Sequence, residues 1–116
     1  GATWFNADKI REMANDWDFS KEGRVRQSNR MKSFADFEKS HGRIAVCDFV
    51  CPTAETRRLF GADFTVWLDT IKEGRYEDTN QLFERPTNVE IRIAEWNEKN
   101  HHDVAEEVLR LRGRNV

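Results

Sequence analysis

The sequence predicts an α/β fold, in which helices flank a mainly parallel sheet. The apolar run from Ile44 to Val50 is typical of a strand that is buried on both faces, as strands of parallel sheets are. A short helix pattern at 53–60 and a second β-rich run at 64–68 follow it, and this spacing favours a parallel crossover. The chain is short enough that residues 1–116 are predicted to form a single domain.

The first strand and the first two helices follow from β-favouring residues and helix caps. Residues 3–6 predict a short strand, after which the chain enters a helix for which Asn6 or Asp8 supplies the cap. Ser20 is a typical N-terminal cap for a longer helix that extends to about Ser40. The apolar residues of this helix recur every three positions and define the face predicted to be buried: Met31, Phe34 and Phe37.

The elements of the second half are separated by a polar segment. The helix at 53–60 ends at Gly61, a residue that commonly terminates helices. Residues 69–88 are mostly polar and predict a lid or flap rather than a core element. Residues 89–96 alternate apolar and polar side chains, which predicts a half-exposed strand near a sheet edge. A last helix is predicted to begin near Asn100.

Composition limits the partners that we expect. The net charge is −2, so the chain lacks the global positive field that drives sequence-independent binding to nucleic acid. No apolar run approaches the roughly 20 residues of a membrane span, and the N-terminus lacks the pattern of a signal peptide. We therefore expect a cytoplasmic protein that contacts neither nucleic acid nor a membrane.

Basic side chains cluster locally, and their role is left open by the sequence. One cluster lies in the first half of the predicted long helix, and the other lies in the short helix at 53–60. Such clusters bind phosphate or cover solvated helix faces. Their members are Arg24, Arg26, Arg30 and Lys32 in the first, and Arg57 and Arg58 in the second.

The two cysteines, Cys47 and Cys51, do not predict a disulfide. Alternation along a strand places them on the same face, roughly 13 Å apart, which is farther than a disulfide spans. Two thiols without a converging third and fourth ligand also make a weak metal site. We therefore expect small buried thiols of a reducing compartment and no metal centre.

Polar residues gather where the predicted strands end. In open parallel sheets, ligands bind beyond the carboxyl ends of the strands. Asp8 and Arg11 follow the first predicted strand, Arg57 follows the second, and Asp69 follows the third. Arginine offers forked donors to phosphate or sulfate oxygens, and a carboxylate can orient a hydroxyl or accept its proton. Singly, each residue also fits a structural role, such as a helix cap or a surface ion pair. Jointly, their positions favour a pocket for a phosphorylated nucleotide.

In order and spacing, these residues resemble the half of the adenylyl-sulfate kinases that follows their phosphate-binding loop. That family carries an Asp-x-x-Arg pattern, a Phe-Ser-x-Glu-Asp-Arg stretch, a strand that closes in Ser-Pro, and a Val-Asp-Thr strand end. The resemblance covers residues 1–70. The matched positions are Asp8 and Arg11; Phe19, Ser20, Glu22 and Arg24; Phe49, Val50 and Pro52, with Arg57; and Asp69-Thr70.

The resemblance implies a fold, a reaction and a set of site residues. Members of the family transfer the γ-phosphoryl group of ATP to a ribose hydroxyl of adenylyl sulfate, with magnesium. By resemblance, Asp8 is the catalytic candidate, which orients the acceptor hydroxyl. Gln27 and Cys51 stand where the family has Asn and Ser. The residues expected to bind the acceptor nucleotide are Arg11, Phe19, Arg24, Gln27, Phe49, Val50, Cys51, Pro52, Arg57 and Asp69.

The chain departs from the family at its most important motif. The sequence contains no Gly-x-x-x-x-Gly-Lys-Ser/Thr loop, so ATP and magnesium are implied only if such a loop lies upstream. In the family, the strand before this loop is central and lies between the strands matched by 44–50 and 64–68. Gly23 also replaces an Asp of the family, and the flap lacks the family's lysine-rich lid.

We therefore expect a truncated P-loop-kinase-like α/β domain that lacks its central strand and its P-loop. Such a domain retains an acceptor-nucleotide pocket and does not transfer phosphoryl groups alone. The alternative is a non-enzymatic module that binds a nucleotide or associates with itself. Unpaired strands favour pairing between copies, so a homodimer is also predicted.

Overall fold

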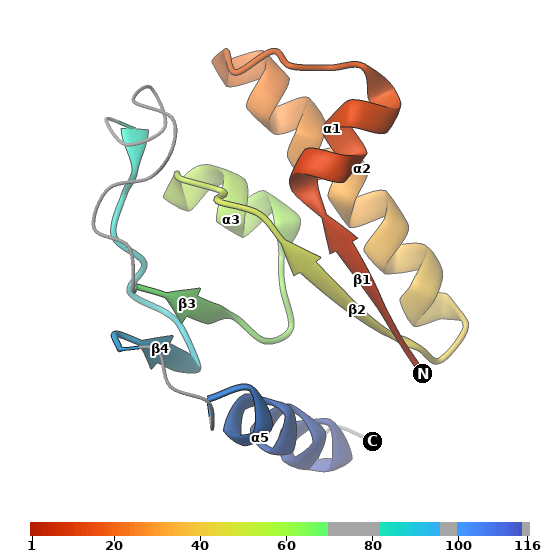
Figure 1. Cartoon of the computed structure of the whole chain (residues 1–116), viewed down its shortest axis with the longest axis vertical. Helices are drawn as coiled ribbons and strands as arrows, with labels where there is room; N and C mark the ends of the chain where they lie inside the picture. The colour runs from red at the N-terminus through yellow and green to blue at the C-terminus, as the bar shows by residue number, and fades with distance from the viewer. Residues whose placement is uncertain (70–81, 96–99, 115–116) are drawn as a thin grey trace.

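The computed structural model describes residues 1–69, 82–95 and 100–114 (Figure 1). Twelve residues of the predicted lid, 70–81, lie outside the described residues. The described residues form helices together with parallel strands, which confirms the predicted α/β class. In chain order they are β1 (Ala2–Asn6), α1 (Ala7–Ala14), α2 (Lys21–Ser40), β2 (Ile44–Asp48), α3 (Ala54–Phe60), β3 (Val66–Leu68), β4 (Ile91–Ile93) and α5 (Asn100–Arg114).

The described strands form two separate parallel pairs instead of one sheet. β1 pairs with β2 from Ala2 opposite Ile44 to Asn6 opposite Asp48. β3 pairs with β4 over three residues. The pairing is parallel in both sheets, as predicted. Among the described residues no ladder joins β2 to β3, so the prediction of one continuous sheet is wrong for them. Three of the four described strands are shorter than predicted, whereas β1 is one residue longer. β2 ends at Asp48, and Cys51, which follows it, has a positive φ of 45°.

Side-chain caps begin the first three helices. The Asn6 side chain accepts a hydrogen bond from the Lys9 amide at 3.1 Å, which decides between the two caps considered for α1. Ser20 accepts from the Gly23 amide at 3.1 Å and caps α2 as predicted. Thr53 caps α3 through the Thr56 amide. Each cap accepts from an amide three residues ahead, so local sequence fixes where each helix begins.

The long helix α2 lies against β2 and α3, and Met31 is its fully buried core residue (Figure 1). The predicted buried face is wrong in part, because Phe34 is 38% and Phe37 58% exposed. Steps of three residues fall short of a full helical turn by about 60°, so positions 34 and 37 rotate progressively away from the face of Met31. Ala35, four residues after Met31, lies on the buried face instead.

Within the described ranges, no helix combines the length and the apolar character that crossing a bilayer requires.

Candidate functional site

A groove of about 480 Å³ lies where the N-terminal ends of α2 and α3 meet. It combines two cationic side chains, one carboxylate, three hydroxyls and an apolar wall. Both helices begin at the groove, so the positive ends of their dipoles lie in this region. The lining residues are Phe19, Ser20, Lys21, Arg24 and Val25 on the α2 side, Thr53, Glu55 and Thr56 on the α3 side, and Leu82.

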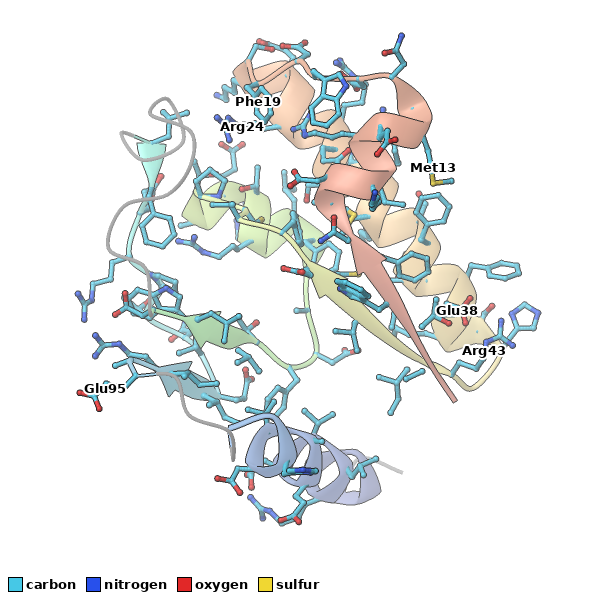
Figure 2. The ribbon with its side chains drawn as sticks, viewed as in Figure 1. Met13, Phe19, Arg24, Glu38, Arg43 and Glu95 are labelled. Atoms are coloured by element: carbon cyan, nitrogen blue, oxygen red, sulfur yellow. The ribbon has the colours of Figure 1, made fainter. Side chains whose placement is uncertain are left out.

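Arg24 and Phe19 form a fixed unit at the α2 side of the groove. The Arg24 Nε donates to the Phe19 carbonyl at 2.9 Å, and the guanidinium carbon lies 5.4 Å from the centre of the Phe19 ring. Figure 2 shows the two residues together at the N-terminal end of α2. The bond through Nε holds the guanidinium in one place, which is the kind of preorganisation that favours binding of an anion.

The hydroxyls of the α3 side form a second, compact unit. The Oγ1 atoms of Thr53 and Thr56 lie 2.7 Å apart, and the Thr56 hydroxyl also donates to the Thr53 carbonyl at 3.0 Å. Thr56 is buried, with 6% of its surface exposed. The Cys51 thiol donates weakly to Thr56 at 3.5 Å, and burial raises the pKa of this thiol above its ordinary value. The Cys51 sulfur is therefore a neutral neighbour of the hydroxyls rather than a thiolate.

Arg11 supports the groove from behind and does not line it. Its Nη1 donates to the carbonyls of Asp16 at 3.0 Å and Asp18 at 3.3 Å, and its guanidinium carbon lies 4.4 Å from the centre of the Phe19 ring. Only 5% of the residue is exposed. Burial lowers the pKa of Arg11, and the charge of Asp16 opposes this effect. The side chain thus fastens residues 16–19 to α1.

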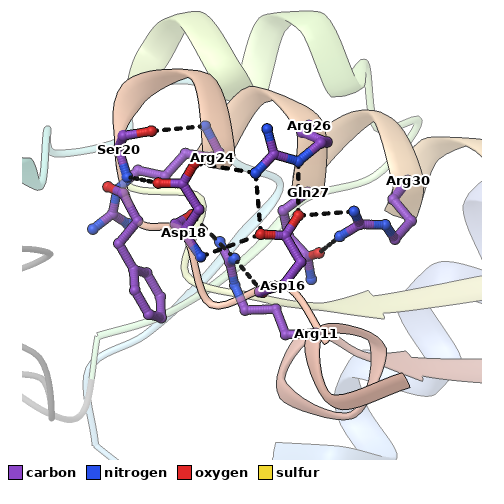
Figure 3. A network of polar contacts seen from close by, with 10 residues as sticks. Arg11, Asp16, Asp18, Ser20, Arg24, Arg26, Gln27 and Arg30 are labelled. Carbon is purple, nitrogen blue, oxygen red and sulfur yellow. Dashed lines mark hydrogen bonds and ion pairs between the residues drawn. The ribbon is translucent and has the colours of Figure 1, made fainter. Parts of the chain in front are cut away.

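The first basic cluster is largely engaged with carboxylates (Figure 3). Asp16 accepts from Arg26 at 2.7 and 3.1 Å and from Arg30 at 2.9 Å. Arg30 also donates to the Gln27 side chain at 2.6 Å, and the Gln27 amide donates to the Ala7 carbonyl at 3.0 Å. Gln27 is 3% exposed and ties α1 to α2, away from the groove lining. For Arg26 and Arg30, the structure therefore favours ion pairing on the helix surface over phosphate binding.

Stability is expected to fall in acid because of Asp16. Hydrogen bonds from Arg26 and then from Arg30 lower the pKa of Asp16 far below its ordinary value. A carboxyl with a depressed pKa in the folded state stabilises the fold fully above about pH 5 and loses this contribution as pH falls further. Urea unfolding at pH 7, 4 and 3 should show this decline, and Asp16→Asn should be less stable at pH 7 with a flatter decline. If the stability of Asp16→Asn falls as steeply with pH as that of the wild type, other titratable groups cause the loss of stability in acid.

The remaining predicted residues lie around the groove or away from it. Phe49 packs edge-on against Phe60, with the ring centres 5.2 Å apart, and Val50 is 59% exposed. Pro52 is buried directly before Thr53. Asp8 is exposed in the first turn of α1. None of these four residues is among those that line the groove.

Arg57 and Asp69 both bind other parts of the protein. Arg57 donates to the Cys51 carbonyl at 2.8 Å and to the Glu84 carbonyl at 2.6 Å. Asp69 is 9% exposed and accepts from Arg92 at 2.6 and 3.0 Å, which holds the end of β3 to β4. Both residues therefore have structural roles.

Among the predicted site residues, Phe19 and Arg24 line the groove. The lining residues that the sequence did not single out as site residues are Ser20, Lys21, Val25, Thr53, Glu55, Thr56 and Leu82. Thr53 carried a usable signal, because it is a cap residue directly after the matched Pro52. Leu82 carried none, since it comes from a distant part of the chain.

Across the described residues, no three His, Cys, Asp or Glu side chains group closely enough to hold a metal ion. A scan against protein-family models gives no match to the chain, and a search of curated proteins gives none either.

Proposed function

We propose that the groove between α2 and α3 binds a phosphorylated or sulfated nucleotide, adenylyl sulfate or a close analogue. One observation carries the proposal. Phe19 and Arg24, from one motif of the kinase resemblance, face Thr53, which follows the matched Pro52 of another motif. The part of α2 after Arg24 and all of β2 separate these two motifs in the sequence. A shared groove is what a common ligand requires, and nothing in the local sequence of either motif demands it.

The lining supports each part of such a ligand. Lys21 and Arg24 carry positive charge for phosphate or sulfate oxygens, beside the N-terminal end of α2. Val25 and Leu82 offer apolar surface for a base. The guanidinium of Arg11 already lies over the ring of Phe19. A base can therefore stack only on the part of this ring that Arg11 leaves uncovered. The groove therefore suits a ligand whose anionic end meets Arg24 and whose base lies toward Leu82.

The arrangement of the strands supports the kinase resemblance, but the chain lacks the residues that bind ATP in that family. The two parallel pairs are separated between β2 and β3, which is where the family has the strand that leads into its P-loop. The amide cradle, the phosphate-binding lysine and the magnesium-binding hydroxyl of that loop have no counterpart in the sequence. We infer that the chain holds an acceptor and not ATP.

The purified chain is therefore expected to transfer no phosphoryl group. Incubation with magnesium, radiolabelled ATP and adenylyl sulfate should give no labelled product above the rate without protein, because the largest electrostatic contribution to phosphoryl transfer is missing. The same assay with an intact adenylyl-sulfate kinase is the positive control. Labelled product that scales with the concentration of the chain would contradict this part of the proposal.

Binding itself is tested by calorimetric titration with adenylyl sulfate. Arg24→Ala should weaken binding by about tenfold or more, since a hydrogen bond to a charged group contributes about 1.5–3 kcal/mol. The matched control is Lys32→Ala, because Lys32 lies on the same helix and pairs with Asp36 outside the groove. Equal affinities of the wild type, Arg24→Ala and Lys32→Ala for adenylyl sulfate would mean that the ligand does not bind in this groove.

Self-association is a second candidate function, and the sheet favours it. β2 and β3 each have a ladder on one side alone within the described part of the chain. Val46 and Leu68, apolar residues of these two strands, are 49% and 56% exposed. Unpaired strand edges beside exposed apolar side chains promote pairing with another chain. Sedimentation velocity should then show a fraction of dimer that increases with protein concentration. A monomer at all concentrations would contradict this candidate.

A further inference from the structure

Arg57 lies where the β2–α3 connection meets the chain that returns toward β4. Its Nη1 donates to the Cys51 carbonyl, two residues before the Thr53 cap of α3, and its Nη2 donates to the Glu84 carbonyl. A planar guanidinium can hold two carbonyls in a fixed relation, which a single amine cannot do equally well. Arg57 therefore bridges two segments that are distant in sequence and that the strands do not connect.

Two further contacts fix the same segment. The Glu84 amide donates to the Pro52 carbonyl at 2.7 Å, so Glu84 is bound through both of its backbone polar groups. The guanidinium carbon of Arg57 lies 5.9 Å from the centre of the Phe83 ring. Phe83 in turn lies 6.3 Å from the ring of Trp67 in β3. The contacts run from α3 to β3 across the place where no ladder joins the two sheets.

We propose that Arg57 is a positioning residue that clamps residues 82–85 to α3 and thereby holds Leu82 as one wall of the groove. This inference rests on the proposed function for its effect on ligand binding, whereas the clamp itself is a property of the free protein. It gives Arg57 a role different from direct contact with the nucleotide, which the kinase resemblance implies. The guanidinium is engaged with the Cys51 and Glu84 carbonyls and does not line the groove.

Backbone amide exchange in the full chain tests the clamp without a ligand. Arg57→Ala should speed exchange of the Glu84 amide about tenfold, the effect of losing one hydrogen bond that holds the segment closed. The Met31 amide in the core of α2 serves as the reference, and it should exchange at the wild-type rate. Arg57→Lys should give a smaller increase in the exchange rate of Glu84, because an ammonium group can still donate to one of the two carbonyls that the guanidinium holds. Arg58→Ala, an exposed neighbour on the same helix, should change neither amide.

Titration of the same variants with adenylyl sulfate completes the test. Weaker binding to Arg57→Ala, together with faster Glu84 exchange, is the expected result. Unchanged Glu84 exchange in both Arg57 variants overturns the clamp, and faster exchange with unchanged affinity overturns its role in the groove. If the wild type does not bind adenylyl sulfate, the proposed function fails, while the exchange rates still decide the clamp. Should Arg57→Ala unfold, Arg57→Lys provides the same comparison.

Discussion

Gly23→Ala is expected to lower the free energy of unfolding by about 2 kcal/mol or more, in spite of the higher helix propensity of alanine. A Cβ atom at position 23 would lie 2.1 Å from the Asp18 carbonyl oxygen and 2.8 Å from the Asp18 carbonyl carbon. Both atoms are backbone, so no side-chain rotation relieves the overlap. Relief requires the 16–20 turn to move away from α2, which disturbs the ion pairs of Asp16 and Asp18 with Arg26.

Urea unfolding monitored by circular dichroism measures this loss. Asn29→Ala is the matched control, because Asn29 is exposed on the same helix and its replacement adds helix propensity without a close approach. We expect the control to be as stable as the wild type or slightly more stable. A Gly23→Ala protein with wild-type stability would mean that Asp18 does not lie against α2 as described.

Arg11→Met is expected to lower the free energy of unfolding by about 2–3 kcal/mol. The change keeps an apolar stem of similar length and removes the donor to the Asp16 and Asp18 carbonyls, together with the cation over Phe19. The two carbonyls lose a charged donor, and Phe19 loses the contact that supports it from behind. The turn that presents Phe19 to the groove should therefore loosen.

The variant Arg24→Met distinguishes the residue that supports the 16–20 turn from the residue that is proposed to contact the ligand. Arg11 is 5% exposed and donates to two carbonyls, whereas Arg24 is only half-buried, so replacing Arg24 should affect stability less than Arg11→Met does. The same denaturation experiment measures both variants, and the order of the two midpoints is the result that matters. If Arg24→Met is the less stable protein, then Arg11 is not the main support of the turn.

Local signals in the sequence predicted the helix starts well. Asn6 and Ser20 are cap residues whose partners lie three residues ahead, so their role depends on adjacent sequence alone. The buried face of α2 was predicted less well, because an apolar residue every three positions does not follow the period of 3.6 residues. Phe34 is stacked on Phe5 of β1 and remains partly exposed.

Contacts between distant residues could not be predicted from the sequence. Asp69 pairs with Arg92 through the register of β3 and β4, and Arg57 binds Glu84 across the gap between the sheets. Both pairings depend on how the chain folds back, and no local pattern encodes that. The same limit explains why the sequence did not predict Leu82 as part of the groove lining.

Gly23 shows how a departure from a family pattern can be read in structural terms. The kinase resemblance places an Asp at this position, and any side chain there would overlap the backbone of Asp18. In this protein Asp16 and Asp18 supply carboxylates for Arg26 from the preceding turn. The carboxylates beside α2 are thus carried by the turn, and glycine is what allows the turn to approach the helix.

The central claim is that the groove between α2 and α3 is the nucleotide site, and a titration of the isotope-labelled chain with adenylyl sulfate tests it most directly. The account predicts shifts of the backbone amide signals of Phe19 to Val25 and of Thr53 to Thr56, with no shift at Met13, which lines a separate apolar groove beside β1. Shifts confined to Met13 and its neighbours, or no shift at millimolar ligand, would contradict it.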